Sequence, residues 1–185
     1  MIAPDDVLEF WFKDDHTLFR AEWFVAAPLF DASCTSFAEA LKAARNGSLD
    51  HWTGSPRGVL ALIVLLDQFS RNLHRGSPEA YAADAQARAL ACDAVSRGLD
   101  KELHPMERLF LYLPFEHSED LADHHESVRL FEAIRLTLGD STVEHAYRHR
   151  DVIRRFGRFP HRNAMLGRES TAEEQRYLAQ PDAGF

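Results

Sequence analysis

Three short polar segments of this chain hold side chains that can bind a ligand or transfer protons. The most informative runs from Arg155 to Asn163 and places three arginines, a histidine and an amide within nine residues. Gly157 and Pro160 end the preceding helix, so these polar groups are presented on a loop rather than along a helix face. A loop of this composition is typical of a binding site for an anionic group.

A second polar segment, Asp67-Gln68-Phe69-Ser70-Arg71-Asn72, follows a strongly apolar run. At 100° per residue, Asp67, Gln68, Arg71 and Asn72 cover one arc of about 140° on a helix. Charged and amide groups at the end of a buried helix are costly unless they are paired or face a cavity. The segment therefore predicts either an Asp67–Arg71 ion pair one turn apart or one wall of a ligand site.

The third segment contains Glu116 and His117, followed by Glu119, Asp120 and His124. Glu119 and Asp120 are expected in the first turn of a helix, where the helix dipole favours acids. Glu116 and His117 precede that turn and have no such explanation. His117, Asp120 and His124 are weak candidates for metal ligation, because no HExxH motif or paired Glu-x-x-His motif is present. Structural or exposed histidines are the alternative.

The helix that leads into the Arg155–Asn163 loop places His145 and His149 on its apolar side, together with Val152 and Ile153. Two inward histidines one turn apart can hold a metal, or act as a general base with its orienting partner. They can equally be core histidines with satisfied hydrogen bonds. Asp151 on the same helix is a further candidate for acid/base chemistry.

Charge is unevenly distributed along this 185-residue chain. The net formal charge is −8, yet residues 145–168 contain seven arginines and a single acid, Asp151. The negative total argues against non-specific nucleic-acid binding, which needs a broad basic face. A local arginine cluster on an acidic body fits a compact anion or carboxylate partner. The alternative is that the arginines pair with acidic helices of the same domain.

The cysteines and the apolar runs indicate in which cellular compartment the protein is expected. Cys34 and Cys92 have no metal-ligand spacing and lie outside basic surroundings that would activate a thiol, so we expect a reducing compartment and no disulfide framework. No signal peptide precedes the first helix, and the longest apolar run, Val59–Leu66, is too short to span a bilayer. We expect a cytoplasmic protein. Gly-rich phosphate loops and G-x-S-x-G elbows are also missing.

Hydrophobic periodicity predicts helix throughout and no strand. We expect one all-α domain over residues 1–185, in which about eight helices form antiparallel pairs stacked as a superhelix or bundle. The expected helices cover residues 5–12, 28–45, 55–72, 77–97, 104–113, 118–138 and 141–157, and a last short helix begins at Thr171.

Particular residues fix the expected helix ends and faces. Ser55 and Ser118 are predicted caps, Pro114 is predicted to end a helix, and Leu29 is expected on an inner face. Two capping boxes are predicted from the S/T-x-x-E pattern, Ser141 with Glu144 and Thr171 with Glu174.

Nearly the whole chain resembles a bacterial family of uncharacterised proteins, domain-of-unknown-function family 924. The resemblance rests on five segments, in which Ser70 stands where the family pattern has proline: residues 7–12 (VLEFWF), 66–76 (LDQFSRN with RG), 111–120 (LYLPFEHSED), 149–151 (HRD) and 155–169 (RFGRFPHRN through LGRE). It implies an all-α fold similar to tetratricopeptide-like helical stacks. It implies no activity.

Two functions remain open from the sequence. The first is a binding domain for an anionic small molecule or peptide, with these ligand-binding candidates: Asp67, Gln68, Arg71, Asn72, Arg158, His161, Arg162, Asn163 and Arg168. The alternative is a small metal-dependent or acid/base hydrolase, with these catalytic candidates: Glu116, His117, His149, Asp151 and His161. The sequence requires no cofactor, predicts no nucleic-acid or membrane partner, and leaves the oligomeric state open.

Overall fold

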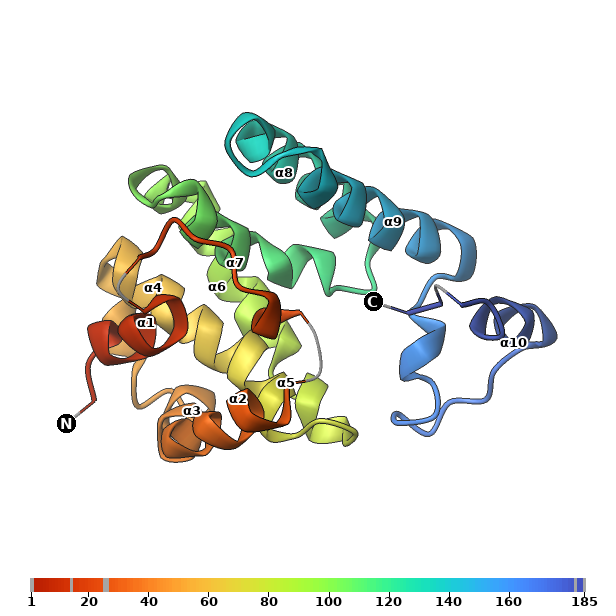
Figure 1. Ribbon diagram of the computed structural model, residues 1–185, viewed down its shortest axis with the longest axis horizontal. Helices are drawn as coiled ribbons and strands as arrows, with labels where there is room; N and C mark the ends of the chain where they lie inside the picture. The colour runs from red at the N-terminus through yellow and green to blue at the C-terminus, as the bar shows by residue number, and fades with distance from the viewer. Residues whose placement is uncertain (1, 14, 25–26, 182, 185) are drawn as a thin grey trace.

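Helices account for all the regular structure in the described residues, 2–13, 15–24, 27–181 and 183–184, of this computed structural model (Figure 1). The expected all-α fold is therefore confirmed. The α-helices are α1 (Pro4–Phe12), α2 (Pro28–Ser33), α3 (Ala38–Arg45), α4 (Pro56–Ile63), α5 (Ser70–Leu73), α6 (Asp84–Ser96), α7 (Pro105–Glu116), α8 (Leu121–Leu138), α9 (Asp140–Phe156) and α10 (Ala172–Leu178). Short 3-10 or π segments connect several of them: Ala21–Trp23, Cys34–Phe37, Asp50–Gly54, Val64–Phe69, Pro78–Tyr81, Leu99–Glu102 and Pro160–Arg162.

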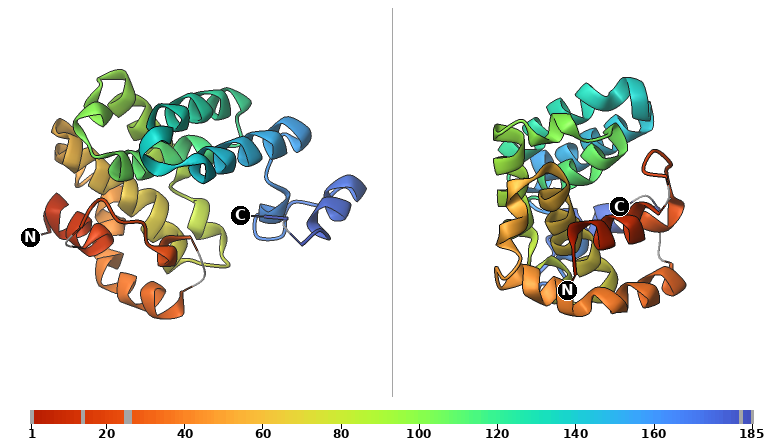
Figure 2. Two further views of the ribbon diagram at one scale, coloured as in Figure 1. Left: turned by 45° about the horizontal axis from the view of Figure 1, so that its top comes forward. Right: turned by 90° about the vertical axis from the view of Figure 1, so that its left-hand side faces the viewer.

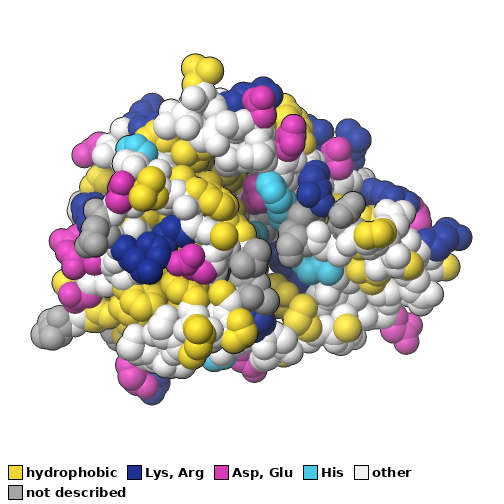
Figure 3. Space-filling view, in the orientation of Figure 1, with side chains coloured by type: hydrophobic (Ala, Val, Ile, Leu, Met, Phe, Trp, Pro, Cys, Tyr) yellow, Lys and Arg dark blue, Asp and Glu magenta, His cyan; other side chains and the backbone are white. Residues whose placement is uncertain are grey.

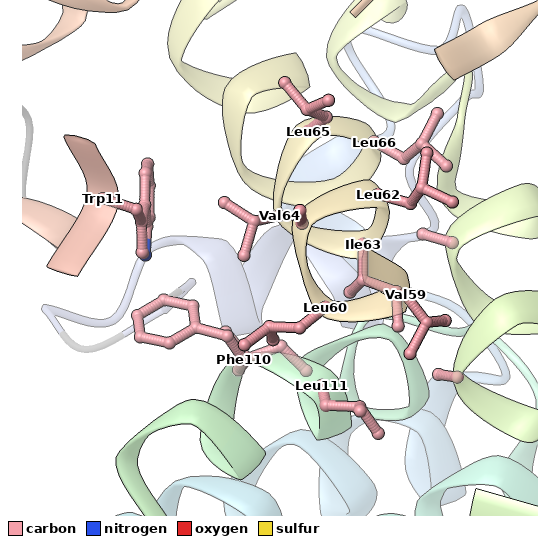
Figure 4. Packing of buried hydrophobic residues seen from close by; sticks show 14 of the residues in the cluster. Trp11, Val59, Leu60, Leu62, Ile63, Val64, Leu65, Leu66, Phe110 and Leu111 are labelled. Carbon is pink, nitrogen blue, oxygen red and sulfur yellow. The ribbon is translucent and has the colours of Figure 1, made fainter. Parts of the chain in front are cut away.

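Helix α4 forms the centre of the core, as its apolar sequence predicts. Ser55 caps it by accepting a hydrogen bond from the Gly58 backbone N–H, and every residue from Gly58 to Phe69 is buried. A Cβ on Gly58 would lie 2.1 Å from the Trp52 carbonyl oxygen, so a residue with a side chain does not fit there. Trp11 from α1 and Phe110 from α7 pack against α4 (Figure 4).

Some helices pack directly on α4, and others pack on these in turn. Helices α1, α6 and α7 contact α4, α7 packs on α8, and α8 packs along α9 (Figures 1 and 2). After α9 the chain turns away, and the segment that carries α10 lies to one side of the helical body (Figure 1). The antiparallel, tetratricopeptide-like superhelix stays a prediction.

Helix α7 continues through Pro114 to Glu116, so the prediction that proline ends this helix is wrong. Pro114 cannot donate a backbone hydrogen bond to the fourth residue before it. Residues 109–116 are nonetheless all buried, and their packing holds the last turn in helical conformation. This last turn carries Glu116 and ends at His117.

Several local predictions need correction. Asp120, not Ser118, caps α8, and α9 begins after Gly139 without the predicted Ser141–Glu144 capping box. Leu29 is 89% exposed rather than on an inner face, because the predicted 28–45 helix is divided by a 3-10 turn that changes the direction of its apolar side. The Thr171–Glu174 capping box is confirmed.

Within the described part of the chain, no helix is both long enough and apolar enough to cross a membrane.

Candidate functional site

A buried carboxylate hydrogen-bonded to a histidine joins the end of the α4 helix to the end of α7. The helix widens into a π segment at Val64–Phe69, and Ser70 N–H donates to the Leu65 carbonyl five residues back. Such widened turns are often found at functional sites because they redirect side chains. Here the π turn contains Asp67, whose Oδ1 lies 2.8 Å from His117 Nδ1.

Asp67 is ionised although it is completely buried. Burial opposes ionisation, but the Arg71 guanidinium 3.0 Å away and the His117 ring outweigh it, so the pKa of Asp67 lies well below its ordinary value. Gln68 Nε2 donates to the second oxygen, Oδ2, at 2.6 Å. The predicted Asp67–Arg71 pair is therefore confirmed, and it belongs to a larger network.

The ionised Asp67 determines the tautomer of His117. A carboxylate only accepts hydrogen bonds, so Nδ1 of His117 must carry the proton and Nε2 carries the lone pair. Burial and the nearby Arg71 charge lower the pKa of His117, which keeps the ring neutral at pH 7. The side chain is 15% exposed, and Nε2 has no hydrogen-bond partner among the described residues. We call Asp67 and His117 the dyad.

Two arginines and a tyrosine lie beside the dyad. Arg71 makes a bidentate pair with Asp84 of α6, at 3.0 Å for both bonds. Arg162 lies 3.5 Å from the same aspartate, donates to the His117 carbonyl at 3.0 Å, and stacks over the Tyr81 ring. Burial and the Arg71 charge lower the pKa of Arg162 to about 10, so it remains protonated.

A second acid–histidine pair lies directly behind the dyad. Glu116 Oε1 is 3.1 Å from Nδ1 of His149, which also donates to the His145 carbonyl at 2.9 Å. Burial and the Asp67 charge raise the pKa of Glu116 to about 8, and burial lowers that of His149 well below its ordinary value. The two adjacent carboxyl groups therefore differ in charge at pH 7, with Asp67 ionised and Glu116 protonated.

Phe159 connects the loop after α9 to this cluster. Its fully buried ring lies 5.9 Å from His124, 5.7 Å from His149 and 5.5 Å from His161, measured between ring centroids, and 4.5 Å below the Arg162 guanidinium. Burial lowers the pKa of His124, and that of His161 falls to about 4. Neutral histidines thus surround the dyad from α8, α9 and the loop.

The arginines of the Arg155–Asn163 loop and its neighbours largely pair with acids of the same chain. Arg158 pairs bidentately with Glu174, Arg155 with Glu173, and Arg168 bidentately with Glu119. Glu119 also accepts from Phe159 N–H at 2.8 Å. Internal pairing, the alternative left open by the sequence, accounts for most of the basic charge.

The structure gathers part of the predicted site and separates the rest. The following predicted residues lie together: Asp67, Gln68, Arg71, Glu116, His117, His149, His161 and Arg162. Asn72 instead donates to Asp31, Asp151 pairs with Arg150 on the outer side of α9, and Asn163 donates to Ser170. His145 is exposed, not inward, because the C-terminal segment covers α9 at Val152 and Phe156 but not at His145.

The metal candidates have other partners. His117 contacts Asp67, Asp120 accepts from Ala122 N–H as the α8 cap, and His124 Nε2 lies 2.7 Å from the Ser118 carbonyl. No three His, Cys, Asp or Glu side chains of the described residues are arranged to hold a metal ion.

Four site residues were missed by sequence reasoning: Tyr81, Asp84, Glu119 as a loop anchor, and Phe159. Glu119 had a local explanation in the first turn of a helix, and Phe159 is typical of an ordinary core aromatic. A search for acids able to balance seven arginines would have singled out Asp84 and Glu119.

A hollow is visible between the helical body and the C-terminal segment (Figure 3). In Figure 3, apolar side chains gather on the N-terminal side of this hollow, and histidine and basic side chains lie along its other side. Near the dyad, Arg71 and Asp84 are 20% and 19% exposed, and Arg168 and Glu119 are 24% and 28% exposed. The charged groups next to the dyad can therefore meet a small molecule from solvent.

The fold and the site define an all-α protein with a buried acid–histidine pair at a helix junction. The chain belongs to the family described as "Bacterial protein of unknown function (DUF924)", whose model matches residues 7–182, and this confirms the resemblance seen in the sequence. A protein of unknown function from Agrobacterium tumefaciens has a similar structure, with 41% identity and a TM-score of 0.86 over 95% of this chain and 96% of that one. No curated protein matches the chain.

Proposed function

We propose that the protein is an acid/base hydrolase acting on small substrates that carry an anionic or ester group, with His117 as general base. The observation that carries this proposal is the 2.8 Å contact between Asp67 Oδ1 and His117 Nδ1, while no described residue forms a hydrogen bond with the opposite ring nitrogen, Nε2. A buried aspartate that fixes the tautomer and orientation of a histidine is a recurring arrangement in hydrolases.

The surroundings of His117 support a base that works near neutral pH. A general base must be unprotonated at the working pH, and its lone pair must face the substrate. The lowered pKa of His117 keeps its ring neutral, and the Nδ1–H···Oδ1 hydrogen bond leaves the lone pair on Nε2. Asp67 would also stabilise the imidazolium that forms when His117 takes a proton.

Water is the nucleophile in this proposal. Burial raises the pKa of Cys34 to about 12, and burial also raises that of Cys92, so both remain thiols. The Ser118 hydroxyl donates to Asp123 and does not contact the His117 ring nitrogens. His117 Nε2 would accept a proton from water as its oxygen bonds to the substrate carbonyl carbon. The same proton would then pass to the leaving oxygen as its bond to carbon breaks.

Arg71 is placed to stabilise the negative charge that develops in such a reaction. It is partly exposed and lies beside both members of the dyad. Asp67 and Asp84 already balance its charge in the resting protein, so anion binding would rely on directed N–H donors rather than on net positive charge. Arg168, which pairs with Glu119 and is partly exposed, is a second N–H donor.

A panel of aryl esters, aryl amides and aryl phosphates tests the proposal. His117→Gln should lower kcat/KM on the best substrate by about 100-fold or more, the usual contribution of a general base. His125→Gln is the matched control, because His125 is exposed on α8. A wild-type protein inactive on the whole panel, or an unaffected His117→Gln variant, would contradict hydrolysis. Thermal stabilisation by carboxylates without turnover would instead favour the binding function.

A further inference from the structure

Another cavity lies between α3 and the end of α5, and none of the residues that line it belongs to the site around the dyad. It has a volume of about 630 Å³ and is open to solvent. That volume is within the range of pockets that hold small molecules. We call it the α3–α5 cavity.

The sequence of α3 gives this cavity an apolar wall with a basic edge. The residues of α3 that line it follow the i, i+3, i+4, i+7 spacing and therefore share one helix face: Ala38, Leu41, Lys42 and Arg45. Leu73 ends α5 and lines the same cavity, and His74 follows it directly. The cavity thus combines aliphatic side chains with basic ones.

The charged and titratable side chains that line the cavity are all basic. Lys42, Arg45 and His74 contribute to it and no acid of the described residues does, although the chain carries a net charge of −8. Lys42 pairs with Glu39 at 3.8 Å, but both side chains are largely exposed, so this pair is weak. Among the described residues, no carboxylate lies within ion-pair distance of Arg45 or His74.

Arg45 is the side chain of this cavity that most needs a counter-ion. Its Nη2 donates to the Ser70 hydroxyl and, at 2.8 Å, to the Glu79 carbonyl, and both acceptors are neutral. Its Nε is buried and has no hydrogen-bond partner in the part of the chain that the structure describes. The helix dipole favours Lys42 and Arg45 in the last turn of α3, but it does not account for a buried Nε without a partner. A partly buried guanidinium in this state is stabilised by an anion.

We infer that the α3–α5 cavity binds a small organic phosphate, with its phosphoryl oxygens at Arg45, Lys42 and His74 and a compact apolar group against Leu41 and Leu73. A guanidinium, an ammonium and an imidazole together match the charge and the oxygens of a phosphate better than those of a carboxylate. The aliphatic wall favours a phosphate attached to a carbon group over inorganic phosphate. The inference does not depend on the proposed hydrolysis, because it involves neither residue of the dyad.

Calorimetric titration with phenylphosphonate tests this binding, because its phosphorus–carbon bond resists hydrolysis. It should bind at least about fivefold more tightly than inorganic phosphate or benzoate, since its ring leaves water at Leu41 and Leu73. Arg45→Gln should weaken the binding by about tenfold or more, and Lys42→Gln by about threefold. The Lys42 side chain is 74% exposed, so folding should be preserved in its variant. Lys101→Gln, an exposed lysine outside the cavity, is the matched control and should not change the affinity.

Nitrogen-15 NMR of the amide groups locates the bound phosphonate. The signals of residues 38–46 and 73–74 should shift, and His117→Gln should leave the affinity unchanged. Undetectable binding of phenylphosphonate would overturn the inference. Equally tight binding of benzoate or inorganic phosphate, equal affinities of Lys42→Gln and Lys101→Gln, or shifts confined to the surroundings of the dyad would each overturn it as well.

Discussion

The helical body and the C-terminal segment are held together by different forces. One apolar cluster extends from Val7 to Ala146, whereas the end of α9 and the segment after it share a small cluster of three buried residues, Val152, Ile153 and Phe159. Ion pairs such as Arg168–Glu119 and Arg158–Glu174 position that segment. Apolar burial should therefore set the stability of the body, while pH and charge should set the placement of the loop. The dyad lies where the two regions meet.

The largest expected effect is in the body. Phe110→Ala removes a fully buried ring that contacts Trp11, Phe12 and Trp23, and it should lower the free energy of unfolding by about 4 kcal/mol. Urea unfolding measures this change. Phe19→Ala, an exposed aromatic, is the control and should change it by less than about 1 kcal/mol. A similar effect of both substitutions would contradict the assignment of stability to the body's core.

Acid should lower the free energy of unfolding through the buried histidines around the dyad. Burial lowers the pKa of His124, His149 and His161 below the ordinary value of 6.5, so the unfolded chain binds more protons than the folded one as pH falls through 6.5. Stability from these groups is therefore present above pH 6.5 and lost below it. In a Glu116→Gln background, the free energy of unfolding should fall by about 2 kcal/mol or more from pH 6.5 to 5.5, about 1 kcal/mol each from His149 and His161. If acid left the unfolding free energy of this variant unchanged, the three histidines would have to be exposed to solvent in the folded protein.

Glu116 should have the opposite effect: its contribution to the free energy of unfolding should fall as the pH rises above 6.5. Its pKa of about 8 is raised above the unfolded value of 4.5, so the folded state holds a proton that the unfolded state has already released. Between pH 6.5 and 8 the wild type should therefore lose about 2 kcal/mol of stability relative to Glu116→Gln, which cannot release this proton. Urea unfolding at four or five pH values measures both the histidine effect below pH 6.5 and the Glu116 effect above it. The same decline in the variant would show that another group is responsible.

The smallest expected effect concerns the loop anchor. Glu119→Gln keeps an acceptor for Phe159 N–H but removes the charge that pairs with Arg168. Because both side chains are about a quarter exposed, global stability should fall by about 1 kcal/mol or less. Hydrogen exchange of residues 159–168 should nevertheless accelerate, while exchange in α4 stays unchanged. Equal acceleration in α4 would mean that the loop and the body open as one unit.

Local sequence signals predicted the helices better than their junctions. Ser55-Pro56, Gly157 and the Thr171–Glu174 box mark helix ends correctly because each acts within one turn. Pro114 gave the wrong end, since burial of the whole α7 turn outweighs the lost backbone hydrogen bond. His145 was placed inward because helical periodicity does not show how far the C-terminal segment covers α9.

The candidate site was predicted in part for the same reason. The Asp67–Arg71 pair lies within one helical turn and follows from spacing alone. The contacts of Asp67 with His117 and of Arg71 with Asp84 join helices far apart in the sequence, so residue spacing cannot reveal them. The loop is basic in sequence, but most of its charge is balanced in the folded protein because its arginines pair with acids from other segments.

The state of the His117 ring tests the central claim most directly. Nitrogen-15 NMR of histidine-labelled protein, with His117→Gln used to assign the signal, distinguishes the protonated ring nitrogen from the one with a lone pair. At pH 7 we expect a neutral ring with the proton on Nδ1, held by Asp67, and an unprotonated Nε2. A proton on Nε2, or a doubly protonated ring at pH 7, would contradict the dyad as a general base.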